Sequence, residues 1–246
     1  MGKVYLIGAG PGDPELLTVK ALRILERAQV VVHDRLVSRE ILRLAPHATL
    51  IDGGKRRGEQ AQIQDYINQT LIRHARLCHT VVRLKAGDPM VFGRGAEEWE
   101  FLLAHGIDVE VVPGVSSALA VPALCGIPLT CRGIAASFAV IAGHREQFMR
   151  TEWPQYAHID TLVVLMGVEN REYIAESLIR TGRSPLQSVA FIENGTTERE
   201  RVVETNLSAV AAGLVEVQPP AVLVIGEVVR LRSILAPART IGAEAL

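Results

Sequence analysis

Short apolar runs alternate with longer amphipathic stretches along most of the chain, a pattern typical of strands that alternate with helices. In the first half, runs rich in β-branched residues and bounded by Gly, Pro or Asp predict strands over 4–7, 30–33, 49–51, 81–84 and 109–112. Apolar positions at helical spacing predict helices over 16–25, 62–77 and 95–105. Continuous apolar strands separated by helices indicate a mainly parallel sheet with both faces covered.

The second half of the chain repeats this alternation after Pro113-Gly114, where we expect a hinge between two domains. It predicts strands over 136–141, 162–165, 189–192, 202–204 and 222–225, and helices over 116–124, 172–179 and 207–212. The length of 246 residues fits two units, because a single hydrophobic core seldom grows beyond ~250 residues. The predicted fold class is α/β, with an N-terminal α/β domain at 1–113 and a C-terminal α/β domain at 114–246.

Composition narrows the class of protein. Hydrophobic residues make up 48% and charged residues 22% of the chain, which supplies a packed core and excludes wholesale disorder. The net charge of −1 argues against a general nucleic-acid binder, which needs a basic excess. The longest apolar run, 115–129, is interrupted by prolines and a glycine and is shorter than the ~18 residues of a membrane-spanning helix. A strand-like start without a signal-peptide pattern, and three cysteines outside any C-x-x-C spacing, predict a cytoplasmic protein with reduced thiols.

A loop rich in glycine and proline, Gly8-Ala9-Gly10-Pro11-Gly12-Asp13-Pro14, joins the first strand to the first helix. Its glycines permit positive φ and a close approach of the backbone to a ligand, and Asp13 can cap the helix with Pro14 at its first position. Asp34, at the end of the second strand, would suit a dinucleotide fold. However, Asp13 stands where that fold has its third glycine, and two prolines remove N–H donors. The loop favours a ligand without phosphate; a plain strand–loop–helix corner remains the alternative.

Blocks of sequence collinear from residue 4 to about residue 231 carry a resemblance to a known family. The blocks are 4–18, 33–38, 54–56, 82–89, 92–98, 113–118, 126–130, 166–167, 193–197 and 226–229. The opening block resembles the tetrapyrrole (corrin/porphyrin) methylases, which use S-adenosylmethionine (SAM). Gly54-Lys55-Arg56 and Phe92–Glu98 resemble one branch of that family, the uroporphyrinogen-III C-methyltransferases.

The resemblance implies two α/β domains with SAM in the cleft between them, usually in a homodimer. It also implies methylation of uroporphyrinogen III at two ring carbons to give precorrin-2, which leads to sirohaem and cobalamin; S-adenosyl-L-homocysteine is the second product. This chemistry needs no metal, because the sulfonium methyl group is already activated, and the sequence has no His, Cys or carboxylate cluster at metal-ligand spacing.

For SAM, the resemblance implies a set of loop residues: Pro11, Ala86, Gly87, Asp88, Val91, Ser116, Ser117, Met166 and Gly195. The serines can offer hydroxyl groups and helix N-terminal N–H groups to the carboxylate of SAM. Met166 would, on composition alone, more often belong to a core than to a ligand site. Ala86 replaces a glycine typical of the family, which is tolerated if its φ is negative.

Four residues match positions that act in catalysis in the resembling family: Asp34 as proton acceptor, Lys55 as proton donor, Arg94, and Glu97, which would orient Arg94 from one helical turn away. The high pKa of an arginine makes Arg94 an awkward base. The alternative for Arg94 and Glu97 is an exposed pair of opposite charge with no role in the site.

The substrate is rich in carboxylates, so the resemblance implies basic contacts at Arg56, Arg94 and Arg132, whose guanidinium groups suit bidentate binding of carboxylate. The chain has four lysines against 22 arginines, so a general arginine bias is the alternative for any single one of them. Cys131 and Gly133, beside Arg132, depart from the histidine and aspartate frequent in the family.

Three functional hypotheses follow. The first is a uroporphyrinogen-III C-methyltransferase with no nucleic-acid or membrane partner. The second is a methylase of a later corrin intermediate or of RNA, against which 54–56 and 92–98 weigh. The third is a dinucleotide-binding or non-catalytic α/β protein, against which the Pro-Gly-Asp-Pro loop weighs.

Overall fold

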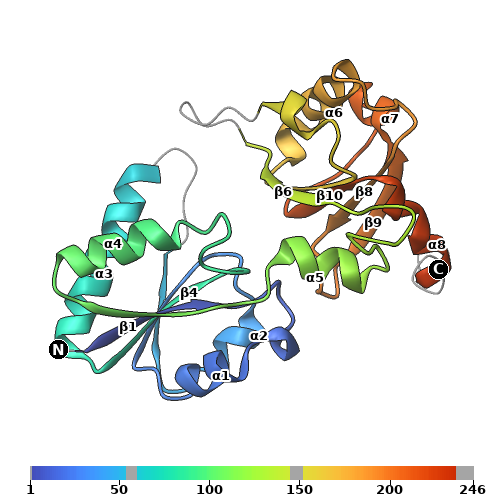
Figure 1. Cartoon of the computed structure of the whole chain (residues 1–246). Helices are drawn as coiled ribbons and strands as arrows, with labels where there is room; N and C mark the ends of the chain where they lie inside the picture. The colour runs from blue at the N-terminus through green and yellow to red at the C-terminus, as the bar shows by residue number, and fades with distance from the viewer. Residues whose placement is uncertain (1, 54–59, 145–151, 237–246) are drawn as a thin grey trace. The chain divides into compact units, whose positions relative to one another are not determined.

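The computed structural model describes residues 2–53, 60–144 and 152–236. The chain divides into two compact units, Met1–Ser116 and Ser117–Leu246 (Figure 1). The sequence predicts a division three residues earlier, after Pro113. Among the described residues, no helix is both long and apolar enough to cross a membrane.

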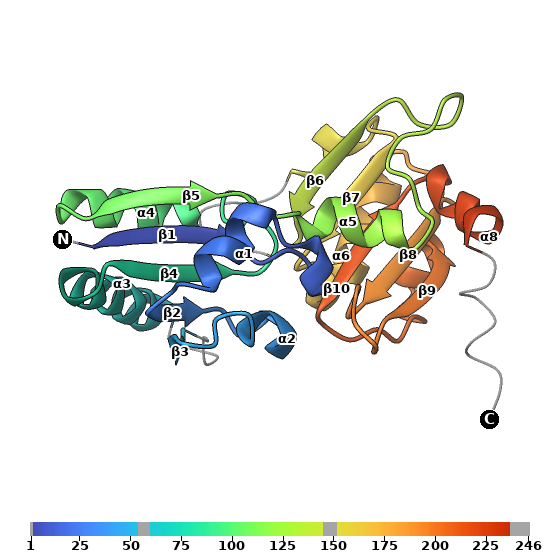
Figure 2. The ribbon, with the colours of Figure 1, turned by 90° about the horizontal axis from the view of Figure 1, so that it is seen from below.

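The first unit is built on a five-stranded sheet in which every pairing is parallel, as the apolar strand pattern predicts. In the order β3-β2-β4-β1-β5, its strands are Thr49–Asp52, Val30–His33, Thr80–Lys85, Lys3–Gly8 and Asp108–Val112 (Figure 2). Because all five run in the same direction, the loops that follow them emerge at one edge of the sheet. In open α/β sheets, ligands bind at this carboxyl edge of the strands.

Helices cover both faces of this sheet (Figure 1). Buried side chains of α3 (Gln60–Leu77) and α4 (Gly95–Ala104) pack on one face together with Val4, Leu6 and Val81. The other face packs against α1 (Val19–Leu25) and α2 (Arg39–Leu42). The sequence pattern misses α2, because a helix of this length offers too few turns for an apolar period to be seen.

The first helix begins later than the sequence predicts. Asp13 accepts a hydrogen bond from the Glu15 N–H (2.8 Å), but this caps a short 3₁₀ helix, Pro14–Leu16. The chain then extends, and the side chain of Thr18 accepts from the Ala21 N–H (3.2 Å) to cap α1. The prediction that Asp13 caps the main helix is therefore wrong, since Thr18 provides a second N-cap within the same apolar stretch.

The second unit contains a sheet of mixed direction, in the order β6-β7-β10-β8-β9. Its strands are Phe138–Ala142, Thr161–Leu165, Ala221–Ile225, Ser188–Glu193 and Arg201–Asn206. β6 and β7 are parallel, whereas β10 is antiparallel to both of its neighbours and β8 is antiparallel to β9. The expected mainly parallel sheet is therefore wrong for this unit: residues 194–200 alone join β8 to β9, and a parallel crossover needs a dozen or more residues.

Helices also cover both faces of the second sheet (Figure 1). Buried residues of α6 (Arg171–Arg180) and α7 (Leu207–Ala211) pack on one face. α5 (Ser117–Leu124) packs on the other face through Ala118 and Val121, together with Cys125, which directly follows the helix. α8 (Arg232–Leu235) follows β10 after a 3₁₀ turn. Since β10 is antiparallel to both β7 and β8, those two strands are parallel to each other, and the loops after them emerge at the same edge.

Candidate active site

Three loops at the carboxyl edge of the first sheet meet through their glycines. A Cβ atom on Gly8 would lie 2.5 Å from the Gly114 nitrogen and 2.6 Å from the Gly87 oxygen, so no side chain fits at this junction. Gly10 and Gly87, with φ of +72° and +68°, exchange two backbone hydrogen bonds of 3.1 and 2.8 Å. The loops after β1, β4 and β5 are thus held together by backbone contacts that glycine alone permits.

Asp88 completes this junction with its carboxylate. Its Oδ1 accepts from the Met90 N–H (2.8 Å), and its Oδ2 accepts from the Gly114 N–H (3.0 Å). Ala86 is not among the residues with positive φ, so its methyl group brings no backbone strain. Three expected SAM residues, Ala86, Gly87 and Asp88, therefore lie in one well-anchored loop.

The segment after Asp88 holds strained backbone and exposed apolar side chains. Phe92 and Arg94 have φ of +53° and +58°, a region that residues with a Cβ atom seldom adopt. Val91, an expected SAM contact, and Phe92 are both exposed to solvent. Strained backbone of this kind tends to gather at ligand sites, which fits the expectation for Val91.

Arg94 and Glu97 contact each other as the sequence predicts. The Arg94 Nε lies 3.0 Å from each Glu97 carboxylate oxygen, and Nη2 lies 2.5 Å from Oε2. Both side chains are exposed, at the start of α4. The pair can orient Arg94 toward a bound anion, but its geometry is also that of an ordinary surface ion pair.

Asp34 follows β2 and is tied to β4 by both its backbone and its side chain. Its N–H donates to the Leu84 oxygen (3.0 Å), and its Oδ1 pairs with Nη2 of Arg83 (2.5 Å). Arg83 in turn donates from Nε to Oε1 of Glu98 (3.1 Å). Lys85 donates to the same oxygen (2.9 Å). The candidate proton acceptor thus stands at the end of a buried network of charges.

Burial and neighbouring charges shift the pKa values of Arg83 and Lys85 in opposite directions. Desolvation lowers the pKa of Arg83, but the charges of Glu98 and Asp34 outweigh it, so this pKa is raised from its ordinary value. Desolvation and the charge of Arg83 together lower the pKa of Lys85, with Glu98 opposing them. Arg83 is therefore the firmly charged member that faces Asp34.

The sequence analysis assigns no role to Arg83, Lys85 or Glu98, which fall within the matching blocks 82–89 and 92–98. One signal could have found them. Arg83 and Lys85 stand two residues apart, and so on the same face, in a strand whose other residues after Thr80 are apolar. Buried cations require partners, so this spacing predicts a buried acid from a covering helix. Lys55 and Arg56 lie outside the described residues.

In the second unit, Met166 directly follows β7 and is solvent-exposed (48%), with φ of +57°. This exposure excludes the alternative that Met166 belongs to a core, and its contact with SAM stays a prediction. Gly195 follows β8 at the same edge, between Asn194 and Thr196, which also have positive φ. A Cβ atom on Gly195 would lie 2.5 Å from Cγ1 of Val121 on α5, so the loop packs closely on that helix.

The expected serines and Arg132 flank α5. Ser117 is the first residue of the helix and Ser116 directly precedes it, so the helix begins one residue later than the sequence predicts. Arg132 is exposed in the loop after α5, where Cys131 and Ala135 form an isolated bridge. Gly133 has φ of +79° with open space around its Cα, a backbone conformation that glycine adopts without strain.

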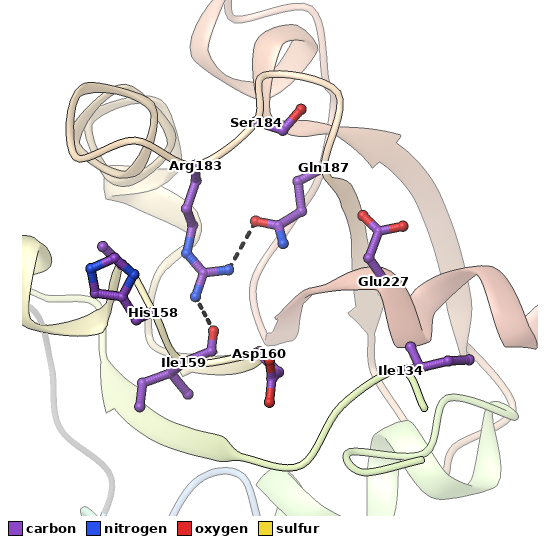
Figure 3. Close-up of a pocket in the computed structure, with 9 residues that line it drawn as sticks. Ile134, His158, Ile159, Asp160, Arg183, Ser184, Gln187 and Glu227 are labelled. Carbon is purple, nitrogen blue, oxygen red and sulfur yellow. Dashed lines mark hydrogen bonds between the residues drawn. The ribbon is translucent and has the colours of Figure 1, made fainter. Parts of the chain in front are cut away.

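A pocket of about 220 Å³ lies elsewhere in the second unit, where β7 and β8 begin (Figure 3). Its Arg183 donates to Gln187 Oε1 (2.8 Å), to the Tyr156 oxygen (2.8 Å) and to the Ile159 oxygen. Burial lowers the pKa of Arg183. Arg183 thereby joins the loops at this end of the sheet, and the expected site residues do not line the pocket. Among the described residues, no group of three His, Cys, Asp or Glu side chains is arranged to hold a metal ion.

Comparison with known proteins gives consistent matches over most of the chain. A sequence profile of the family described as Tetrapyrrole (Corrin/Porphyrin) Methylases matches residues 3–211. A uroporphyrinogen-III C-methyltransferase of Methanocaldococcus jannaschii is 44% identical over 94% of this chain and 98% of its own length. One of Pseudomonas aeruginosa is 46% identical over 93% and 95%. The crystal structure of a uroporphyrin-III C-methyl transferase from Thermus thermophilus complexed with S-adenosyl homocysteine is 52% identical, covers 94% of this chain and 100% of its own, and has a TM-score of 0.84.

Proposed function

This chain belongs to the tetrapyrrole (corrin/porphyrin) methylase family, and we propose that it is a uroporphyrinogen-III C-methyltransferase. It transfers methyl groups from SAM to two ring carbons of uroporphyrinogen III, giving precorrin-2 and S-adenosyl-L-homocysteine, in the pathways to sirohaem and cobalamin. The observation that carries this proposal is the similarity to the Thermus enzyme crystallised with S-adenosyl homocysteine. The relatives of the same name, matched over nearly their whole length, support it.

The SAM residues of the proposal come from loops in each unit. In the first unit, Pro11, Val91 and Ser116 follow Gly10, Asp88 and Gly114 within three residues, and the backbones of those three residues are anchored at the junction. In the second unit, the exposed Met166 and the close-packed Gly195 follow parallel strands, and Ser117 begins α5. Fixed loops suit this reaction, because aligning the ring carbon, the methyl group and the sulfur is the main demand on the protein.

The chemistry assigns the remaining roles. The ring carbon supplies the electron pair for the new carbon–carbon bond as the sulfur–methyl bond breaks, and S-adenosyl-L-homocysteine leaves. A proton must then depart from the methylated macrocycle. Asp34, partly exposed at the edge of the sheet, is the proposed acceptor, and Lys55 is the proposed donor. Arg56, Arg94 and Arg132 are proposed to bind the substrate carboxylates.

Finer features of the proposal concern the setting of the enzyme. We expect it to act as a homodimer in the cytoplasm, without a nucleic-acid or membrane partner. The net charge of −1 agrees with the absence of a general affinity for polyanions. The dinucleotide hypothesis is abandoned in view of the family match.

The experiment that tests the function is anaerobic incubation with SAM and uroporphyrinogen III, followed by mass analysis of the tetrapyrrole. Addition of one and then two methyl groups is expected. A parallel incubation with S-adenosyl-L-homocysteine in place of SAM is the control and should add none. A protein that binds SAM but leaves uroporphyrinogen III unmethylated would overturn the proposal, and methylation of a later corrin intermediate alone would favour the second hypothesis.

A further inference from the structure

We propose that Arg83 and Glu98 are positioning residues for Asp34: Glu98 fixes the Arg83 guanidinium, which holds the Asp34 carboxylate in its working orientation. This inference rests on the proposed function, in which Asp34 accepts the proton that leaves the methylated ring. Neither Arg83 nor Glu98 reaches the substrate in this scheme. They act through Asp34, to which Arg83 is bound directly.

The three nitrogens of the Arg83 guanidinium are all engaged, which fixes its plane. Nε donates to Glu98 Oε1 (3.1 Å), and Nη2 donates to Asp34 Oδ1 (2.5 Å). Nη1 lies 3.4 Å from the Val32 oxygen and 3.3 Å from the Leu84 oxygen. A lysine at this position could bond one of these acids but could not span both, because its single ammonium group lacks the guanidinium fork.

Glu98 is held through one of its two carboxylate oxygens, while its buried Oε2 has no hydrogen-bond partner among the described residues. Its Oε1 accepts from Arg83 (3.1 Å), from Lys85 (2.9 Å) and from Nε2 of Gln64 (3.1 Å). The Glu98 side chain has no exposed surface, and that of Arg83 is 2% exposed. These contacts tie β4 to the two helices on one face of the sheet, α3 through Gln64 and α4 through Glu98.

Stability alone is a weak explanation for such a network. Removing charges from water is costly, and well-packed apolar side chains often serve a core equally well or better. The network balances two cations, Arg83 and Lys85, with two acids, Glu98 and Asp34. It runs from the fully buried Glu98 to Asp34, whose side chain is 33% exposed. Asp34 is the member of the network that reaches solvent, and it is also the proposed proton acceptor. This coincidence supports a role of the buried members in orienting the Asp34 carboxylate.

The decisive test combines single substitutions with a double-mutant cycle. Arg83→Lys keeps the charge but loses the fork, and Glu98→Gln keeps the size but loses the charge. We expect each to lower the single-turnover rate of methylation at saturating SAM and uroporphyrinogen III about 10- to 100-fold, since small misplacements of a reacting group cost up to ~10² in rate. SAM affinity by calorimetry and the KM for uroporphyrinogen III should change less than about 3-fold.

In an Asp34→Asn background, the same two substitutions should have almost no further effect on the rate, because the group that they position is already disabled. Leu102→Val is the matched control: Leu102 is a fully buried residue of α4, four positions after Glu98. It loosens the packing of the helix without touching the charges, and it should leave the rate near that of the parent. Thermal melts would verify that all variants are folded.

The outcomes separate this inference from the function on which it rests. A parent protein that does not methylate uroporphyrinogen III overturns both. If the parent turns over normally, but Arg83→Lys and Glu98→Gln lower the rate as much in the Asp34→Asn background as in the parent, only the positioning role is overturned. The positioning role is also overturned if Leu102→Val lowers the rate as much as Glu98→Gln, or if the losses appear only in KM or in SAM affinity.

Discussion

The contacts of Asp34 distinguish two explanations of this residue, a ribose-binding acid in a dinucleotide fold and a catalytic proton acceptor. They favour the proton acceptor. A dinucleotide-binding acid presents its carboxylate to ribose hydroxyl groups, whereas the Asp34 carboxylate pairs with a buried arginine that is itself held by a buried acid. Such a pairing keeps the carboxylate in one place, as a proton acceptor requires.

Asp34→Asn is therefore expected to act on the chemical step. Asparagine keeps the size of the side chain but cannot accept a proton, and general-base contributions are typically ~10²–10⁴ in rate. Single-turnover methylation should fall within that range, while the SAM dissociation constant measured on the same preparation changes little. A large loss of SAM affinity with unimpaired chemistry at saturation would contradict the assignment.

Glu193, at the end of β8, should make the second unit sensitive to acid. Hydrogen bonds from Arg201 (2.8 and 2.9 Å) lower the pKa of Glu193; burial opposes this, and the Gln218 N–H contributes in the same direction as Arg201. A carboxylate whose pKa is lower in the folded protein stabilises it above the unfolded pKa of ~4.3. That contribution is lost as pH falls through the lower, folded value.

Glu193→Gln should accordingly reduce the free energy of unfolding at neutral pH, and the difference from the parent should shrink as the pH falls below ~4. Denaturant titrations between about pH 3 and about pH 7 would measure this. Glu176→Gln, at an exposed position of α6, is the matched control and should leave the curve unchanged. A constant difference between Glu193→Gln and the parent across the whole range would refute the role of this carboxylate.

At the scale of elements, the alternating pattern predicts every strand of the structure to within two residues at each end. The direction of β10 could not be predicted, because an apolar run shows that a strand is buried but not which way it runs. The direction of β9 could have been inferred, because the link at 194–200 is too short for a parallel crossover. The predicted start of α1 at residue 16 is too early, because the apolar spacing continues from the 3₁₀ helix Pro14–Leu16 into α1. The caps on Asp13 and Thr18 show that these are two separate helices.

The loop elements at the glycine junction lead to a prediction about Gly10. It combines a φ of +72° with backbone bonds to Gly87. Gly10→Val should strain this turn and weaken SAM binding, measured by calorimetry, by about an order of magnitude or more for 1–3 kcal/mol of strain. Gly106→Val is the control, since Gly106 has a similar φ of +73° with open space around its Cα, outside the candidate site.

Gly106→Val should lower stability without lowering SAM affinity. Unchanged SAM binding by a folded Gly10→Val protein would place the cofactor elsewhere.

At the scale of the whole molecule, the sequence predicts which strand ends carry the candidate site. It does not predict the buried side-chain contacts that support those strand ends. Asp34, Ala86 and Met166 stand directly after strands, and short motifs suffice to mark them. The contact of Arg83 with Glu98 joins residues on a strand and on a later helix, so only the packing of one element on the other reveals it. Exposure is equally hidden, as Met166 illustrates: its apolar side chain indicates a core, yet its loop leaves it in solvent.

The charge of the whole chain sets the last prediction. A net charge of −1 provides no overall attraction for a substrate rich in carboxylates, so binding must depend on local arginines. Arg94 and Arg132 are both exposed to solvent, where a large anionic substrate can reach them. Arg94→Met or Arg132→Met should weaken tetrapyrrole binding by roughly 1.5–3 kcal/mol, or one to two decades, with SAM affinity intact. Arg27→Met, at an exposed position just after α1, is the control and should bind as the parent does.

Added salt should act in the same direction as these substitutions. Raising the ionic strength from about 0.1 M to about 1 M shortens the screening length from ~10 Å to ~3 Å, so the KM for uroporphyrinogen III should rise while SAM affinity changes little. In the Arg94→Met and Arg132→Met variants this salt dependence should be smaller, because part of the attraction that salt screens is already gone. Wild-type kinetics and wild-type salt dependence in both variants would show that Arg94 and Arg132 are ordinary surface residues, and that the arginine-rich composition of the chain is sufficient to explain them.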